Sequence, residues 1–284
     1  MSANFSLINE FEILEKMIVD HTGEIFKCKH KGTNTFFLLR RYSQSIFNSM
    51  EIEIDYLREK TILFDLTKKN SKNIPKIYNS FEDNSYRYFL MEYFQGKTLK
   101  QLVEGQTDKD NDNIEEKIII NILKEMLKIL SFLHDECFVL HRNIKPSSII
   151  IDENNNIKLI GFHLSAYLKN QKRILVCGKS AKGAKDYVAP EILFGNSQTL
   201  DYDYKCDIFS LGYTIYYLMN KELPTKTKII NSKVVRTENP IKNTNYSPWL
   251  IKFVQTLYSN DPKQRPTASQ ALQILENNSN NQQP

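Results

Sequence analysis

The sequence predicts an α+β fold in two parts, a smaller β-rich part followed by a larger, mainly helical part. Three observations predict it. Short apolar segments separated by turn residues fill the first 90 residues. Longer segments with apolar residues at helical spacing follow Gly96. The 284 residues, 41% of them hydrophobic, also suffice for two packed cores without disulfides or a metal.

The first part is predicted to contain one main helix among strands. Strands are expected at 11–19 (FEILEKMIV), 23–30 (GEIFKCKH), 35–42 (TFFLLRRY), 76–81 (KIYNSF) and 86–93 (YRYFLMEY). Residues 45–66 carry apolar groups at helical spacing, so we expect the helix there. The expected extent of this part is 1–92.

The second part, expected over 93–276, carries four predicted helices at 114–136, 206–221, 247–259 and 267–278. Thr267, directly after Pro266, is the expected N-cap of the last one. Residues 105–113 are predicted to form a polar loop, and the segment before Pro248 shows little helical periodicity. The tail 277–284 (NNSNNQQP) is of low complexity, which predicts disorder.

Composition excludes several classes of protein. The four cysteines lack paired metal-ligand spacing, which argues against a zinc site or a disulfide scaffold and favours a reducing, cytoplasmic location. The N-terminus lacks the pattern of a signal peptide, and no apolar run has the length of a membrane span. A net charge of +5 does not indicate nucleic-acid binding. We therefore expect neither nucleic acid nor a membrane as partner.

Several ordered motifs give the chain a resemblance to the eukaryotic protein kinases of the serine/threonine type. The motifs are LMEYFQGKTL (90–99), HRNIKPSSIII (141–151), GFH (161–163), DYVAPEIL (186–193), DIFSLG (207–212) and DPKQRPTASQAL (261–272). The resemblance covers roughly residues 11–276. It implies a bilobal fold with a nucleotide cleft and a catalytic loop, here in degenerate form.

The resemblance implies that the residues of phosphoryl transfer are replaced. Asn143 stands in the place of the aspartate that accepts the proton of the substrate hydroxyl, and an amide cannot accept it. Gly161 replaces the aspartate that binds magnesium, and Ser148 replaces an asparagine that assists with a second ion. Asp152 is a nearby acid, but we expect it to cap a turn, while His163 replaces a glycine.

In the first part, Arg40 takes the place of the phosphate-pairing lysine, and Glu59 matches the glutamate that would pair with it in a structural bridge. Leu38 replaces the small residue above adenine; a shift of one residue would instead put Arg41 and Leu39 in these places. The glycine-rich loop keeps Gly23, which an ordinary hairpin also explains, while the other two glycines are replaced. The vestigial cleft positions are thus Ile18, Asp20, Gly23, Ile25, Leu38, Arg40, Glu59, Met91, Glu92 and Ile150.

The residues that shape such a fold are, by the same resemblance, retained. They comprise an apolar column, its anchor, an ion pair and two catalytic-loop cations: Leu63, Ile77, His141 and Phe162; Asp207; Glu191 with Arg265; Arg142 with Lys145.

This pattern predicts a pseudokinase, a protein-binding scaffold or allosteric module with no functional catalytic residue, cofactor or metal. The alternative is an atypical serine/threonine kinase that binds ATP, with or without magnesium. The segment between Gly161 and Tyr187 is rich in basic residues, and its composition is typical of a solvated loop. The alternative is that it binds an acidic protein surface or filament within a cytoskeletal or other large complex. Its cations are Lys169, Lys172, Arg173, Lys179, Lys182 and Lys185.

Overall fold

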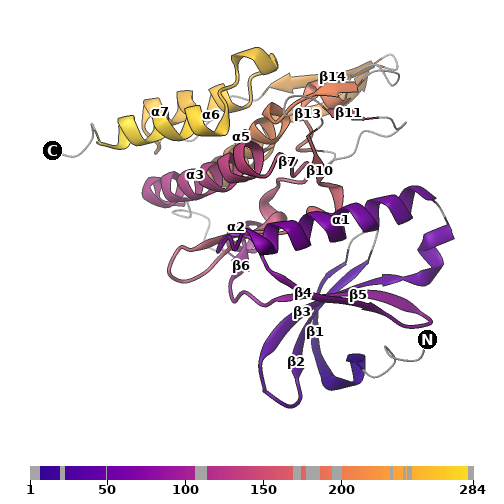
Figure 1. The fold of residues 1–284 in the computed structure, drawn as a ribbon. Helices are drawn as coiled ribbons and strands as arrows, with labels where there is room; N and C mark the ends of the chain where they lie inside the picture. The colour runs from indigo at the N-terminus through magenta and orange to yellow at the C-terminus, as the bar shows by residue number, and fades with distance from the viewer. Residues whose placement is uncertain are drawn as a thin grey trace. The chain divides into compact units, whose positions relative to one another are not determined.

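The structure, a computed structural model, describes residues 7–19, 23–48, 50–105, 114–168, 174–176, 186–193, 200–230, 233–238, 241 and 245–280. The chain divides into two compact units, residues 1–95 and 96–284. This division lies three residues beyond the expected boundary at 92. The first unit is β-rich and the second mainly helical, which confirms the predicted α+β class (Figure 1).

The first unit is a five-stranded antiparallel sheet with one long helix. The strand order is β1-β2-β3-β5-β4, with β1 (Phe11–Val19), β2 (Glu24–His30), β3 (Phe36–Ser43), β4 (Ile77–Glu82) and β5 (Tyr86–Glu92). A short 3-10 turn, η1 (Leu7–Glu10), precedes the sheet. The helix α1 (Met50–Lys68) begins later than predicted because Gln44–Asn48 form a separate 3-10 turn, η2.

An aromatic cluster fastens α1 to the sheet. The ring of Tyr56 stacks on that of Phe89, with centroids 4.9 Å apart, and lies edge-on to Tyr42 at 5.2 Å. Both oxygens of Glu53 accept from Arg87 of β5 at 2.7 Å. The inner face of α1 is therefore held by ring packing and by a charged hydrogen bond at once.

The second unit is built on α3 (Glu116–Ser131) and α5 (Lys205–Asn220), and α3 also contacts α7 (Ala268–Asn280). The remaining helices are α2 (Leu99–Glu104), α4 (Pro190–Leu193), α6 (Pro248–Leu257), a π-turn η3 (Phe132–Glu136) and the 3-10 turns η4 (Pro146–Ser148), η5 (Phe162–Leu164) and η6 (Pro262–Gln264). Nearly every residue of α5 is buried, as expected for a helix that is apolar on all sides.

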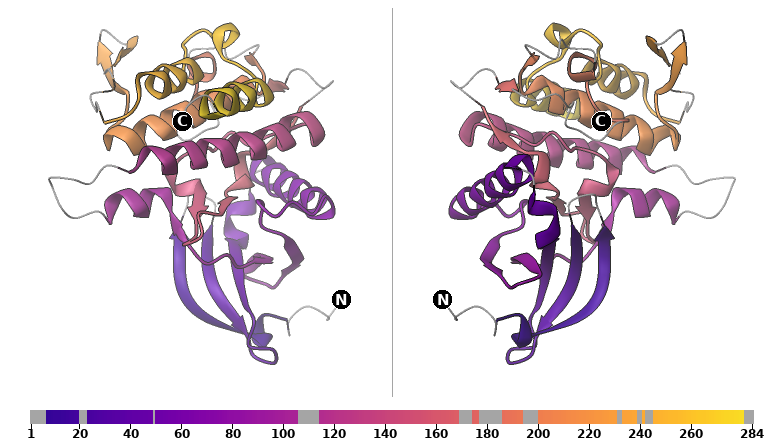
Figure 2. Two further views of the ribbon diagram at one scale, coloured as in Figure 1. Left: turned by 90° about the vertical axis from the view of Figure 1, so that its left-hand side faces the viewer. Right: turned by 90° about the vertical axis from the view of Figure 1, so that its right-hand side faces the viewer.

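Short strands complete this unit. They are β6 (Lys97–Thr98), β8 (Ile149–Ile151) and β9 (Ile157–Leu159) in one sheet, and the pairs β7 (Val139–Leu140) with β10 (Ala166–Tyr167), β11 (Ile174–Val176) with β12 (Leu200–Tyr202), and β13 (Thr225–Ile230) with β14 (Lys233–Glu238). The β13–β14 hairpin occupies a segment for which the sequence predicts no element, and Figure 2 shows it projecting from the body of this unit.

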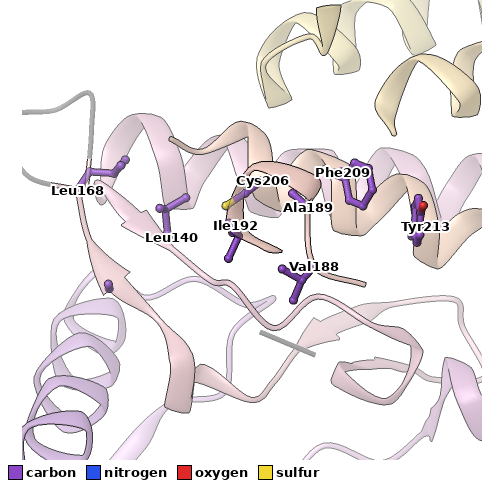
Figure 3. Close-up of a cluster of buried hydrophobic side chains, with 9 residues drawn as sticks. Leu140, Leu168, Val188, Ala189, Ile192, Cys206, Phe209 and Tyr213 are labelled. Atoms are coloured by element: carbon purple, nitrogen blue, oxygen red, sulfur yellow. The ribbon is translucent and has the colours of Figure 1, made fainter. Parts of the chain in front are cut away.

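A buried apolar cluster joins α5 to the segment that leads into α4. It contains Leu140, Ala166, Leu168, Val188, Ala189, Ile192, Cys206, Phe209 and Tyr213 (Figure 3). It fixes the positions of β7, β10 and α4 around the first turns of α5.

Two predictions at the C-terminus have different outcomes. Thr267 caps α7 as expected: its hydroxyl accepts from the Gln270 amide at 3.1 Å, and the Gln270 side chain accepts from the Thr267 amide at 2.9 Å. The predicted disordered tail is partly wrong, because α7 continues to Asn280. Residues 281–284 lie outside the described residues.

Candidate functional site

The segment 141–148 of the second unit is attached to the buried helix α5 through Asp207. The Asp207 carboxylate accepts from the backbone amides of His141 and Arg142, each at 2.8 Å, and from His134 Nε2 at 3.0 Å. Burial alone would raise the pKa of Asp207, but the His134 hydrogen bond and the His141 amide hold that pKa below its usual value. Asp207 thus fixes the start of this loop as an ionised anchor.

Asn143 lies two residues further on, and its side chain is engaged within the protein. Only 2% of the residue is exposed. Its Nδ2 donates to the backbone carbonyl of Gly161 at 3.0 Å, and its backbone amide donates to His141 Nδ1 at 3.3 Å. The Asn143 amide group therefore acts as a hydrogen-bond donor that holds the segment beginning at Gly161 against the loop.

Gly161 has a backbone conformation and a setting that leave little room for a side chain. Its φ is +88°, in the left-handed region. A Cβ built there would lie 2.7 Å from Asn143 Nδ2 and 3.4 Å from Ser148 Oγ. Three of the positions that depart from the kinase pattern in this unit, Asn143, Ser148 and Gly161, therefore meet at one point.

The groups at this point do not fit a magnesium ion. Mg²⁺ prefers several hard oxygen donors, usually including a carboxylate, and the three residues offer an amide, a hydroxyl and a glycine. Across the described residues there is no group of three or more His, Cys, Asp or Glu side chains that could hold a metal. Asp152 caps the β8–β9 turn, as expected, by accepting from the backbone amides of Asn154 and Asn156.

His141 and Phe162 pack against each other in this unit. Their ring centroids are 4.7 Å apart in an edge-to-face arrangement, and His141 Nε2 lies 3.1 Å from the carbonyl of Ile160. Burial lowers the pKa of His141 to about 4, although the nearby Asp207 acts in the opposite direction. His141 is therefore a neutral packing residue. Leu63 and Ile77, the other two residues of the expected column, are buried in the first unit.

Arg142 is also directed inward. Its φ is +60°, it is buried, and its Nε donates to the carbonyl of Leu164 at 2.6 Å. Lys145 is half-buried directly before η4. His163, which replaces the family glycine, lies buried in η5. The Arg142 guanidinium thus helps to fix the segment after Gly161.

Glu191 and Arg265 form a bidentate ion pair between α4 and the end of η6. The two nitrogen–oxygen distances are 2.6 and 2.8 Å, and Arg265 also donates to the carbonyl of Ser259 at 2.7 Å. Arg265 is 1% exposed and its guanidinium lies 4.8 Å from the ring centroid of Phe209. This pair ties α4 to the apolar cluster of Figure 3.

In the first unit, Arg40 and Glu59 are joined through a third residue. Arg40 Nε lies 3.9 Å from Glu59 Oε1, and the hydroxyl of Tyr42 donates to Glu59 while accepting from Arg40. All three side chains are buried. Burial raises the pKa of Tyr42 well above its usual value, so the phenol stays protonated and serves as a bridge.

The same geometry favours the first of the two alignments of β3. Arg40 reaches Glu59, whereas Arg41 pairs with Glu24 of β2 at 2.6 Å. Of the two arginines, Arg40 is therefore the one that lies beside Glu59, as the first of the two alignments expects. Leu38 is buried and pairs in register with Met91 of β5. Ile25 and Ile150 are also buried, and Glu92 accepts from the Lys76 amide at 3.2 Å.

Gly23 is explained by close backbone packing. A Cβ at this position would lie 2.3 Å from the carbonyl oxygen of Arg41, so a side chain would collide with β3. Asp20, the side chain of Ile18, and the basic segment residues Lys169, Lys172, Arg173, Lys179, Lys182 and Lys185 lie outside the described residues.

The sequence does not predict two residues that take part in these hydrogen-bond networks, Tyr42 and His134. Tyr42 stands two residues after Arg40 on the same strand, and this spacing places both on one face of β3, which is the signal that could have found it. His134 contacts Asp207 from 73 positions away in the chain, and no local pattern indicates that contact.

Within the described residues, no helix is both long and apolar enough to cross a membrane. Comparison with protein families shows a match to the protein kinase domain over residues 12–275.

Similar proteins include three named as kinases. They are the serine/threonine-protein kinase dst2 of Dictyostelium discoideum (29% identical over 92% of this chain), the MAP kinase kinase MKK1/SSP32 of Saccharomyces cerevisiae (28% over 88%) and the serine/threonine-protein kinase pakG of D. discoideum (31% over 88%). The chain spans 22%, 49% and 20% of the lengths of these proteins. The order of the secondary-structure elements and the match to the protein kinase domain over residues 12–275 together show that the chain belongs to the protein kinase family.

Proposed function

We propose that the protein is a pseudokinase, a protein-binding scaffold or allosteric module that does not transfer phosphate in the conventional way. The observation that carries the proposal is the contact between Asn143 and Gly161. The amide of Asn143 donates to the Gly161 carbonyl and occupies the space beside the Gly161 Cα where a metal-binding side chain would start.

The chemistry of phosphoryl transfer supports this reading. Members of the family typically use ATP and magnesium, and catalysis rests on positioning and on charge stabilisation. A positioned general base contributes roughly 10²–10⁴-fold, and Asn143 cannot act as one. With glycine at 161, the conventional metal carboxylate is also missing. The general base and the metal-binding carboxylate are thus both missing, and the residues that replace them contact each other.

The first unit adds a second line of support. The guanidinium of Arg40 is buried and turned toward Tyr42 and Glu59, so its charge is used within the unit. By the resemblance to the family, Leu38 would bring a branched side chain to the position above adenine. Both features disfavour a bound nucleotide in the usual pose.

A phosphotransfer assay with ATP and magnesium tests the proposal. We expect the wild-type protein and the Asn143→Ala variant to give the same background incorporation on generic substrates and on proteins recovered with it. Incorporation by the wild type that clearly exceeds that of Asn143→Ala would refute a pseudokinase.

The second candidate is an atypical serine/threonine kinase that binds ATP. The specific observation in its favour is that a cation, Arg40, persists beside Glu59, and that Lys145 is retained. Thermal unfolding with ATP, with and without magnesium, separates the candidates. A ligand at 100 times its Kd would add about 2.7 kcal/mol to the free energy of unfolding. A shift without phosphotransfer would indicate a nucleotide sensor, and a shift with phosphotransfer an enzyme.

The scaffold proposal includes a partner with an acidic surface, such as an acidic tail or a filament, in the cytoplasm. Its support is the basic composition of residues 169–185, whose charges would favour association with an acidic protein. Binding of proteins captured from the native source should weaken strongly as salt is raised. Reversal of Lys179, Lys182 and Lys185 to glutamate should abolish it. Reversal of three exposed lysines elsewhere, Lys68, Lys100 and Lys117, is the control with the same charge change.

A further inference from the structure

The outer face of α1 carries an exposed apolar seam. Met50, Ile54 and Leu57 are 80%, 51% and 49% exposed, although single exposed apolar residues are ordinary on a protein surface. What sets these three apart is their spacing of four and then three residues, which Thr61 continues. This spacing places all four on one stripe of the helix, as in a coiled-coil seam.

The helix cannot turn this seam inward. Tyr56, Glu59, Ile62, Leu63 and Leu66 are buried on its opposite face. The helix is further held in this orientation by the hydrogen bond from Tyr42 to Glu59 on the buried face and by the two bonds from Arg87 to Glu53 at its side. The exposed stripe is therefore a fixed feature of the first unit, and its removal from water requires another surface.

The charges beside the seam match those of the same helix running in the opposite direction. Glu51 and Glu53 flank the seam near its start, whereas Arg58 and Lys60 flank it further along. In an antiparallel pair with Ile54 of one copy facing Leu57 of the second, each Glu51 faces Arg58 and each Glu53 faces Lys60 of the other copy. A parallel pair would also place Glu53 near Arg58 and Lys60 near Asp65 of the other copy, but it would leave Glu51 without a facing cation and would align the acidic starts of the two helices.

We propose that α1 is the contact through which two copies of this chain associate, in a symmetric antiparallel arrangement. The contact is isologous, since each residue pair occurs twice. The apolar seam supplies the affinity, while the flanking charges set the direction and register. Glu53 and Arg58 also have partners in their own copy, Arg87 and Asp55, so their role is to select the orientation.

A seam of this length buries less than the roughly 1,200–2,000 Å² of a standard stable interface. The dimer is therefore reversible and depends on protein concentration. The inference does not rest on the proposed loss of catalysis, because an active kinase with this helix would associate in the same way.

Sedimentation velocity over a concentration series up to about 100 µM tests the proposal. We expect a monomer–dimer equilibrium for the wild type and a dimer Kd at least about tenfold weaker for Leu57→Glu. Ile274→Glu, a change at an exposed apolar residue of α7, is the matched control and should leave the equilibrium unchanged. Circular dichroism melting of each variant shows that it folds. A wild type that stays monomeric, or a dimer that survives Leu57→Glu, would overturn the proposal.

Charge exchange tests the direction of the helices. Glu51→Arg and Arg58→Glu should each weaken the dimer about two- to fivefold, and the double variant should restore it. Mixing Ile54→Cys with Leu57→Cys protein should give an oxidised heterodimer, while each alone should cross-link poorly. Cross-linking of each variant with itself, or no restoration in the double variant, would contradict the antiparallel arrangement.

Discussion

The side-chain amide of Asn143 donates to the backbone carbonyl of Gly161 at 3.0 Å, across 18 positions of the chain. The same nitrogen would lie 2.7 Å from a Cβ at position 161. Two positions that differ from the kinase pattern are thus in contact, and the side chain at position 143 determines how much space is left for a side chain at position 161.

This coupling predicts that Gly161→Asp will not simply restore a magnesium ligand. The φ of +88° and the close Asn143 nitrogen should together cost about 1–3 kcal/mol of unfolding free energy. Urea denaturation measures this loss. Combining Gly161→Asp with Asn143→Ala should cost less than the sum of the two single changes, because the collision is removed. Strictly additive losses would show that the two positions do not interact.

The sequence predicts the elements well where a single periodicity governs a segment. The short apolar-rich segment FEILEKMIV, bounded by turn residues, gives β1 at its observed bounds, and the all-round apolar character of residues 206–221 gives the buried α5. The β13–β14 hairpin is missed because its strands, TKTKII and KVVRTE, mix basic residues and threonine with isoleucine and valine and show no regular alternation of apolar and polar residues, which is a weak strand signal.

The candidate site is less accessible to sequence reasoning. The identities of Asn143, Ser148 and Gly161 can be read from the sequence, but their meeting point depends on how η4 and η5 are placed by α5. The Tyr42 bridge likewise depends on the distance between β3 and α1, which no local pattern specifies.

Tyr42→Phe removes the hydroxyl that bridges Arg40 and Glu59 while it keeps the ring. Two buried charged groups would lose a hydrogen-bond partner, so we expect a loss of about 1.5–3 kcal/mol of unfolding free energy. Tyr88→Phe is the matched control on the neighbouring strand. Its hydroxyl donates to Asp83 at 2.8 Å in a more exposed setting, so its loss should be about 0.5–1.5 kcal/mol. Equal losses for the two variants would argue against a special role of the bridge.

Acidification should destabilise the second unit through His141. Its pKa is about 4 in the folded protein, against 6.5 for a free histidine. Above pH 6.5 both states are neutral and the stability is complete; between pH 6.5 and 4 only the unfolded state takes up the proton. The unfolding free energy should fall by up to about 3 kcal/mol over this range, measured by denaturation at several pH values. The lowered pKa of Asp207 adds a further loss below pH 4.

A replacement of His141 by glutamine should remove most of this pH dependence, whereas His30→Gln, at a half-buried histidine of β2, should leave it in place. An unchanged slope in the His141 variant would assign the dependence to other groups.

Glu191→Gln should be among the most damaging single changes outside the apolar core. The Arg265 guanidinium is almost completely buried, and without the carboxylate its charge would lack a counter-ion. Loss of one partner of a buried pair costs about 3–5 kcal/mol, and the partial exposure of Glu191 places the expectation near 3 kcal/mol. Asp55→Asn, which breaks the more exposed pair with Arg58, should cost less than about 1 kcal/mol. Because Arg265 also contacts Phe209, the Glu191 variant should loosen the start of α5, and faster amide exchange there would separate this effect from a purely local loss.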